Sequence, residues 1–103
     1  MTNKTNIKFG DAIEALKVGK RVTRAGWNGR GMYLWLMPEA IVKAEWCREP
    51  HLKRLAEENG GEISCLGSIR MFTVNAAGRR AILTGWLASQ SDMLSEDWEI
   101  LQD

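Results

Sequence analysis

The segment Met32–Met37 is apolar at every position. In a strand, successive side chains point to opposite faces, so Met32 and every second residue after it face one side, and Tyr33 and every second residue after it face the other. A strand that is apolar on both faces has to be covered on both. A helix of the same chain can cover one face, and a partner subunit is the economical cover for the other.

Tryptophan usage leads to the same expectation. The chain has 103 residues, which predicts a single domain over residues 1–103, and five of its residues are tryptophan. A chain of this size buries only roughly 60–70% of its unfolded surface, and each buried aromatic side chain takes up about 150–250 Å². Some tryptophans are therefore expected to line a pocket or a subunit interface, and the chain is expected to form a homo-oligomer.

Hydrophobic periodicity predicts one N-terminal helix. Phe9, Ala12, Ile13 and Leu16 are spaced to form an apolar stripe on one helix face. Gly19 suits the position just after the helix end, where the backbone adopts a positive φ. The residues before Phe9 are polar and are expected to fray.

The rest of the chain predicts strands and turns. Alternating apolar residues, separated by turns rich in glycine and asparagine, indicate two hairpins and a last extended segment, over 21–25 with 32–37, 68–74 with 79–84, and 97–101. Residues 85–95 fit a short helix or a structured loop. Residues 40–59 are expected to be mostly helical, with a division at Pro50. The predicted fold class is α+β: a small antiparallel β-sheet with one packed N-terminal helix and a helical insertion at about 40–60.

Charge and hydropathy exclude several function classes. The formal net charge is +1, so the chain lacks the strongly basic face of a nucleic-acid binder. No apolar run approaches the ~20 residues of a membrane-spanning helix, and the polar N-terminus does not resemble a signal sequence. These features predict a cytoplasmic protein without nucleic-acid or membrane partners, in which cysteines stay as thiols. The basic residues gather only mildly, at Lys17, Lys20, Arg21, Arg24 and Arg30.

The sequence contains few residues that would indicate a metal site or a catalytic site. Cys47, His51 and Cys65 are the only soft metal ligands, and they lack the close ligand pairs of a zinc site. Buried or half-buried thiols are a better account of the cysteines than a metal site or a disulfide, and no metal or cofactor is expected. A cluster of carboxylates near the C-terminus fits acid–base chemistry, helix capping and ligand binding equally well. Its members are Asp92, Glu96, Asp97 and Glu99.

The segment Gly85–Trp98 places a polar run between two tryptophans, Trp86 and Trp98. Aromatic rings stack on nucleobases at about 1–3 kcal/mol per base in single-strand binders, and arginines pair with phosphates. Trp27, in the glycine-rich turn 26–31, lies close in sequence to Arg21 and Arg24 and completes a nucleotide-sized set. Core packing is the alternative for Trp86 and Trp98, and a plain hairpin turn is the alternative for residues 26–31. The polar run comprises Ser89, Gln90, Ser91 and Asp92.

At these residues the sequence resembles a known family. Three motifs carry the resemblance: Phe9-Gly-Asp-Ala-Ile-Glu-Ala-Leu-Lys-Val-Gly-Lys, Arg24-Ala-Gly-Trp-Asn-Gly-Arg-Gly-Met and Gly85-Trp-Leu-Ala-Ser-Gln-Ser-Asp-Met-Leu-Ser-Glu-Asp-Trp98. They are similar to motifs of the small phage and prophage family that includes the second type of Thoeris anti-defence protein. The resemblance covers residues 9–38 and about 68–101, and nothing is carried over to residues 39–67.

The resemblance implies a sponge rather than an enzyme. Proteins of this family bind the cyclic ADP-ribose signal made by bacterial TIR-domain immunity proteins and hold it intact, so that the downstream effector stays inactive. Some relatives also sequester cyclic dinucleotides at a separate site. They form homo-tetramers with ligand pockets between protomers, and they act in the cytoplasm of the host bacterium.

The same resemblance implies the binding residues. Trp27 and Trp86 would stack on adenine. Charge, rather than a motif of the family, suggests that Arg21 or Arg24 faces the phosphates. Trp98 is the doubtful member, because a terminal strand gives it reason to be core. Two other functions stay open: a protein-interaction module with an exposed aromatic surface, and a nucleotide-processing enzyme. The residues implied to bond ribose or base edges are Asn28, Gln90 and Asp92, and Ser89 is implied to lie at the same pocket.

Overall fold

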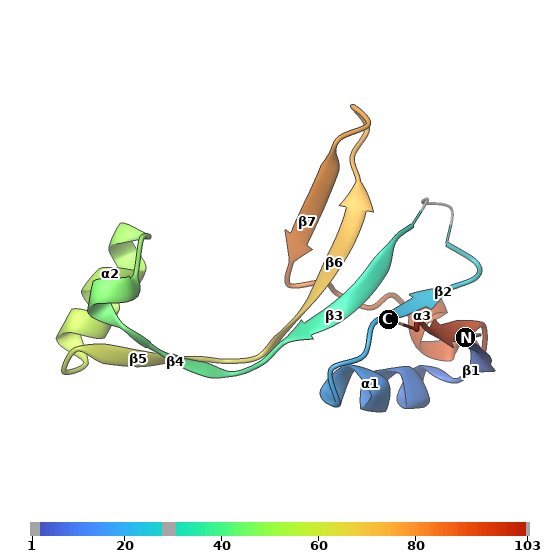
Figure 1. Cartoon of the computed structure of the whole chain (residues 1–103), viewed down its shortest axis with the longest axis horizontal. Coiled ribbons are helices and arrows are strands. Elements are labelled where there is room, and N and C mark those ends of the chain that lie inside the picture. The colour runs from blue at the N-terminus through green and yellow to red at the C-terminus, as the bar shows by residue number, and fades with distance from the viewer. Residues whose placement is uncertain (1–2, 28–30, 103) are drawn as a thin grey trace. The chain divides into compact units, whose positions relative to one another are not determined.

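In the computed structural model of the chain, residues 3–27 and 31–102 are described (Figure 1). The contacts divide the chain into two compact units, residues 1–37 with 68–103, and residues 38–67. The first unit contains a six-stranded sheet and the second a two-stranded sheet. The α+β fold class predicted from the sequence is confirmed, whereas the prediction of a single domain stays a prediction.

The first unit is built on an antiparallel sheet with the strand order β1-β8-β2-β3-β6-β7. Both predicted hairpins are present, since β2 pairs with β3 and β6 pairs with β7. The last extended segment, β8, lies between β1 and β2 and so joins the two ends of the chain. The strands are β1 (Lys4–Ile7), β2 (Val22–Arg24), β3 (Tyr33–Met37), β6 (Ser68–Val74), β7 (Arg80–Thr84) and β8 (Trp98–Ile100).

One sheet face is covered by helix α1 (Phe9–Lys17), as its apolar stripe predicts. The predicted helix end is confirmed: Gly19 has a φ of +88°, and its N–H donates to the carbonyl of Leu16 at 3.0 Å. Four large side chains are fully buried in the core between helix and sheet: Leu16, Val22, Leu34 and Trp98. The core therefore lies on the face of β3 that contains Leu34.

The segment before α1 was predicted to fray, and this prediction is wrong. Residues Lys4–Ile7 form β1, which pairs with β8 through Lys4 opposite Ile100 and Ile7 opposite Trp98. Ile7 is buried in the core. A strand partner from the far end of the chain supplies order that the local polar sequence does not indicate.

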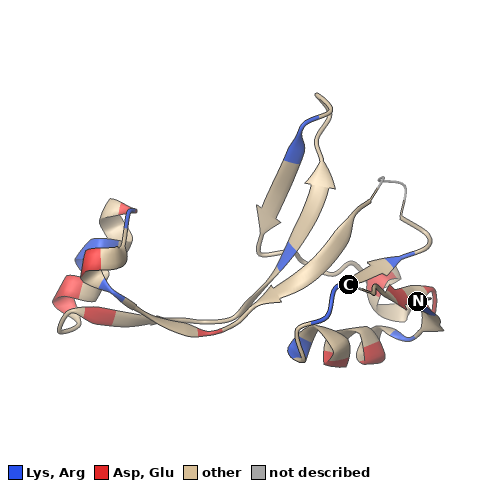
Figure 2. Cartoon of the chain, in the orientation of Figure 1, with Lys and Arg blue, Asp and Glu red and all other residues tan. Residues whose placement is uncertain are grey.

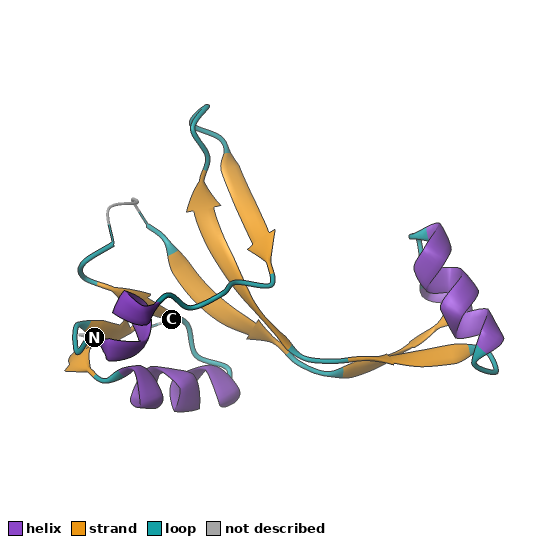
Figure 3. Cartoon of the chain, turned by 180° about the vertical axis from the view of Figure 1, so that it is seen from behind, coloured by secondary structure: helices purple, strands orange, loops and turns teal. Residues whose placement is uncertain are grey.

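Between β7 and β8, the chain forms the short helix α3 (Gln90–Leu94), shown with the loop that precedes it in Figure 3. Ser89 is the N-cap: its hydroxyl accepts the Asp92 backbone N–H at 3.1 Å, and the Asp92 carboxylate accepts the Ser89 backbone N–H at 2.9 Å. This reciprocal capping box satisfies two backbone donors that a helix start would otherwise leave without partners.

The second unit differs from the prediction of a mostly helical segment over 40–59. Helix α2 (Pro50–Glu58) begins at Pro50, in agreement with a proline in the first turn. Two strands were missed, β4 (Ala40–Lys43) and β5 (Glu62–Cys65), which pair antiparallel with Val42 opposite Ile63. The β-branched pair Ile41 and Val42 favours a strand once a partner is present. A short 3₁₀-helix, η1 (Ala44–Trp46), follows β4.

Among the described residues, no helix has the length and apolar character needed to cross a membrane.

Candidate ligand site

The carboxylate of Asp92 is the centre of a hydrogen-bond network at the start of α3. One of its oxygens, Oδ1, accepts from Arg24 Nη1 at 2.8 Å and from Trp27 Nε1 at 3.1 Å. The other, Oδ2, accepts from the Ser89 backbone N–H. The backbone carbonyl of Asp92 accepts from Trp98 Nε1 at 2.9 Å. One buried residue therefore fixes two indole rings and a helix cap at once.

Arg24 lies between two carboxylates. It reaches from β2 to Asp92 and also donates through Nε to Asp97 Oδ1 at 2.9 Å. Its side chain is only 13% exposed. Asp97, the residue directly before β8, accepts the Gly26 backbone N–H at 2.9 Å. This hydrogen bond connects the turn after β2 to the start of β8. The three side chains together have a net charge of −1, and each arginine nitrogen already faces a carboxylate.

This network stabilises ionised carboxylates. Burial alone would raise the pKa of Asp92, but hydrogen bonds from the Ser89 backbone, Arg24, Trp27 and the Ser89 side chain outweigh it and lower the pKa to about 2. The hydrogen bond from Arg24 lowers the pKa of Asp97. The Asp97 and Asp92 hydrogen bonds raise the pKa of Arg24 against the opposing effect of burial. All three groups are therefore charged throughout the neutral range.

Three tryptophans meet above this network in edge-to-face contact. Ring centroids are 5.3 Å apart for Trp27 and Trp98, 6.1 Å for Trp27 and Trp86, and 6.2 Å for Trp86 and Trp98. Such packing is favourable for aromatic quadrupoles and fixes the ring planes. Trp98 is fully buried and also contacts Phe9 of α1. Trp27 and Trp86 are half-buried, so part of each indole is exposed to solvent.

Several large apolar side chains are exposed in the segment that runs from Trp86 to the end of α3. Leu87 is 88% exposed and Leu94 is 77% exposed, although both lie beside the polar run of α3. Met93 is exposed as well. Exposed apolar side chains in a segment that also contains a half-buried indole are typical of a surface that another molecule covers.

The structure brings most of the predicted binding residues together, and many of them bond to one another within one network. Trp27, Trp86, Ser89, Asp92, Arg24 and Trp98 all belong to the network just described. Gln90 is exposed at the first position of α3. Asn28 lies outside the described residues.

Arg21 is placed elsewhere. Its guanidinium lies over the ring of Tyr33, 5.1 Å from the centroid, and its Nη2 donates to the backbone carbonyl of Gln102 at 3.1 Å. Tyr33 faces the side of β3 opposite to the buried Leu34. Arg21 therefore contacts the other face of the sheet from the tryptophan cluster.

The roles of two site residues, Asp97 and Gly26, were not predicted from the sequence. Asp97 orients Arg24, and Gly26 allows the approach: a Cβ at Gly26 would lie 2.7 Å from Asp97 Oδ2 and 3.3 Å from Arg24 Nη2. The signal available in the sequence was the Ser-Glu-Asp-Trp run, in which an acidic residue directly precedes a buried tryptophan. The spatial partner of that acid, on a strand more than 70 residues earlier, has no local signature.

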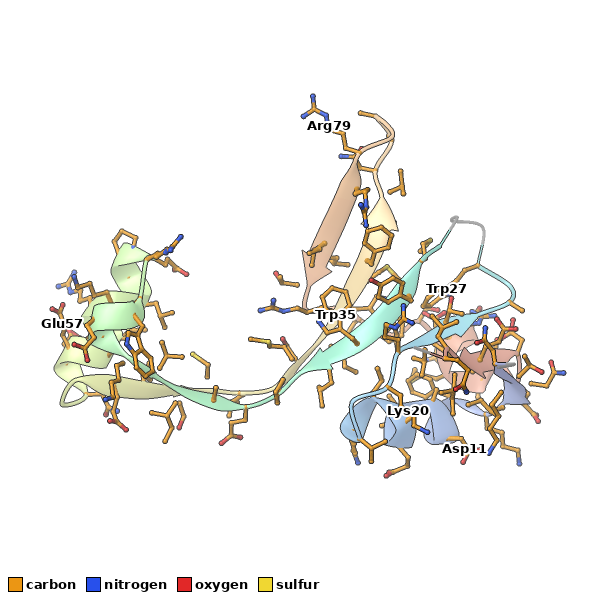
Figure 4. All side chains as sticks on the ribbon, viewed as in Figure 1. Asp11, Lys20, Trp27, Trp35, Glu57 and Arg79 are labelled. Carbon is orange, nitrogen blue, oxygen red and sulfur yellow. The ribbon has the colours of Figure 1, made fainter. Side chains whose placement is uncertain are left out.

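A separate concavity of about 570 Å³ lies on the other face of the sheet, where Trp35 projects from β3 (Figure 4). It is lined by Tyr33, Trp35, Phe72, Arg80, Ala81 and Ile82. Tyr33 and Phe72 stack with centroids 5.2 Å apart, and the Arg80 guanidinium lies 5.4 Å from the Phe72 centroid. The alternation of Tyr33 and Trp35 predicted this aromatic face, but the chain-distant Phe72 and Arg80 were not connected with it.

Comparison with known proteins places these features in a family. The family model of the Thoeris anti-defense 2-like domain matches residues 7–101. The chain belongs to this family. The protein "Thoeris anti-defense 2" of Bacillus phage SP01 is 32% identical over 105 residues, which cover 95% of this chain and 98% of that protein. In this Thoeris anti-defense 2-like chain, the match includes α1, the Trp27 turn and the α3 region, and so every described residue of the tryptophan and Asp92 network.

Proposed function

We propose that this protein is a phage anti-defence protein that acts against Thoeris by binding a cyclic ADP-ribose-type signal and holding it uncleaved. Family membership supports the anti-defence role, since the phage SP01 relative is named for it. The observation that carries the binding mechanism is the pair of half-buried indoles, Trp27 and Trp86, held at fixed angles by Trp98 and Asp92. Indole surface that is already oriented binds a flat nucleobase with a reduced entropy cost.

The charged network supports sequestration rather than catalysis. Asp92 and Asp97 are both ionised at neutral pH and both bonded to Arg24. A carboxylate that stays ionised cannot donate a proton to a leaving group, and one whose oxygens already accept strong hydrogen bonds is a weak base. We therefore assign these residues to orienting the site, with Arg24 holding Trp27 and α3 in place rather than contacting phosphate.

The rest of the ligand contact is expected from exposed groups. Gln90 at the start of α3 and Asn28 in the turn are the candidates for bonding ribose or base edges. Leu87 and Leu94 are suited to contact a second protomer, so that a homo-tetramer with pockets between protomers would enclose the signal. Binding of cyclic dinucleotides at a separate site and action in the cytoplasm of the host bacterium complete the proposal.

A matched pair of tryptophan variants tests the site. Trp27→Ala removes an indole from the cluster, whereas Trp46→Ala removes an indole that is 62% exposed in the second unit. In calorimetric titration with cyclic ADP-ribose isomers, we expect Trp27→Ala to weaken binding about 10- to 100-fold, in line with ~1–3 kcal/mol per stacked base. Trp46→Ala should bind like the wild type.

Three results would contradict the proposal or the site assigned to it. Equal affinity of Trp27→Ala and the wild type would exclude the Trp27 cluster as the binding site. Absence of any heat or tryptophan fluorescence change with the wild type would favour a protein-interaction module, and turnover beyond one equivalent per site would favour an enzyme.

A further inference from the structure

Strand β7 forms an unprotected edge of the six-stranded sheet. It pairs with β6 on one side, and no described strand pairs with its other side (Figure 1). Both of its faces expose apolar side chains: Ile82 is 59% exposed and Leu83 is 49% exposed. Figure 2 shows charge on β7 only at the end that begins with Arg80. An apolar edge strand with free backbone groups is a template for pairing with another chain.

The opposite edge of the same sheet has the protection that β7 lacks. The register of β1 with β8 shifts between Lys4 and Ile7, whereas the register of β7 with β6 is regular from Arg80 to Thr84. Asn6 has a φ of +55°, which interrupts the regular strand geometry. An irregularity of this kind is a usual means of blocking an edge. The contrast indicates that the β7 edge is left open for a specific partner.

The hairpin turn fixes which backbone groups of β7 face the open edge. The Asn75 N–H donates to the Arg79 carbonyl at 2.9 Å, so the polar groups of Arg79 point to β6. Along an antiparallel strand these groups alternate in direction. The N–H and C=O groups of Arg80, Ile82 and Thr84 therefore point outward, ready to bond a further strand.

The sequence of β7 is complementary to itself in one arrangement. With two copies antiparallel about a twofold axis at Ile82, Arg80 lies opposite the partner's Thr84, and Ala81 lies opposite the partner's Leu83. Small side chains then meet large ones, and no like charges are opposed. Parallel pairing in register would place Arg80 opposite the partner's Arg80. We propose that β7 pairs antiparallel with β7 of a second copy of this chain, with Ile82 on the twofold axis.

This pairing brings residues of both copies to the aromatic concavity. Opposite residues of paired strands share a face of the sheet. The partner's Thr84 therefore lies beside Arg80, at the border of the space lined by Trp35, Phe72 and Ile82. Two such concavities, related by the twofold axis, would then adjoin across one continuous sheet.

A charge-swap series tests the register by sedimentation equilibrium of the full chain. Thr84→Glu places a carboxylate opposite the partner's Arg80, and also opposite Arg70 of its own β6, so it should lower the dimer dissociation constant or leave it within about threefold of the wild type. Adding Arg80→Glu then opposes two carboxylates across the twofold axis, and the double variant should raise the constant about tenfold or more. Thr5→Glu, on the exposed β1 edge, should leave the constant unchanged.

Each outcome of the series is decisive. A wild-type chain that stays monomeric at all concentrations overturns the proposal. So does a double variant that associates like the wild type, and so does a Thr84→Glu variant that no longer associates, because another interface or a parallel register would then be in use.

Ile82→Pro provides a second, independent test. The Ile82 N–H faces the open edge, so its removal leaves the β6–β7 ladder intact, and proline is tolerated at such edge positions. We expect the far-UV circular dichroism of the wild type together with an assembly of lower mass, because the β7 contact is lost while the contact proposed at Leu87 and Leu94 is retained. Unchanged association of the folded variant contradicts pairing at this edge.

Discussion

At the residue scale, Asp92 has a larger structural role than any other polar side chain of the described site. It joins Arg24, Trp27 and the cap of α3, while remaining 7% exposed. Asp92→Asn removes the charge that Arg24 pairs with and should reduce the free energy of unfolding by about 1.5–3 kcal/mol. Urea unfolding measures this loss, with Ser91→Ala on the exposed side of α3 as the control. Equal stability of the two variants would contradict the role assigned to Asp92.

The pH dependence of stability follows from the same residue. Because the folded-state pKa of Asp92 is lowered to about 2 from a usual 3.8, its stabilisation is fully present above about pH 4 and is lost as the pH falls toward 2. Unfolding free energies of the wild type should fall more steeply over this window than those of Asp92→Asn, by about 2 kcal/mol in total. Parallel curves for the two proteins would show that the carboxylate is not stabilised in the fold.

Residue types in the site could be predicted from the sequence, but their roles could not. The Gly85–Trp98 run indicated an aromatic and polar cluster, and the structure forms one. The pairing of Arg24 with Asp97, and the burial of Trp98, depend on strands β2 and β8 lying side by side, which has no local signal. Charge alone suggested that Arg24 faces phosphate, whereas two carboxylates already surround its guanidinium.

At the element scale, the turn after β2 requires glycine at position 26, because there is no space for a Cβ atom there. Gly26→Ala would push a methyl group against Asp97 Oδ2 and should destabilise the fold by about 1–3 kcal/mol. Gly10→Ala in α1 is the matched control, since nothing lies within 4 Å of the position that its methyl group would take, and helix propensity predicts a gain of about 0.5–1 kcal/mol. Thermal unfolding that shifts in the same direction for both variants would contradict the close approach at Gly26.

Elements with strong periodicity or turn signals were predictable. Helix α1 and the β6–β7 hairpin follow from the apolar stripe and from the Asn75–Gly78 turn. Strands β1 and β4 were not predictable, because each is short, and each owes its order to a partner distant in sequence. Local propensity is a weak guide for such strands.

At the scale of the whole molecule, the division into two units predicts that residues 38–67 can be removed without unfolding the first unit. The β3–β6 ladder of the first unit ends with Met37 opposite Ser68, so the chain enters and leaves residues 38–67 at neighbouring positions. Replacing residues 38–67 by Asn-Gly, which favours a two-residue hairpin turn, should leave the first unit folded and able to bind the proposed signal. Circular dichroism and calorimetric titration check this, and loss of fold would show that the chain is one inseparable domain.

The proposed function requires that the protein bind an immune signal without changing it. The direct measurement is to saturate the purified protein with a cyclic ADP-ribose isomer, remove the unbound excess, denature the protein by heat and identify the released molecule by mass spectrometry. We expect the cyclic signal to be recovered intact, in a stoichiometric amount per site. Recovery of a cleaved product, or of no nucleotide at all, would contradict the proposed function.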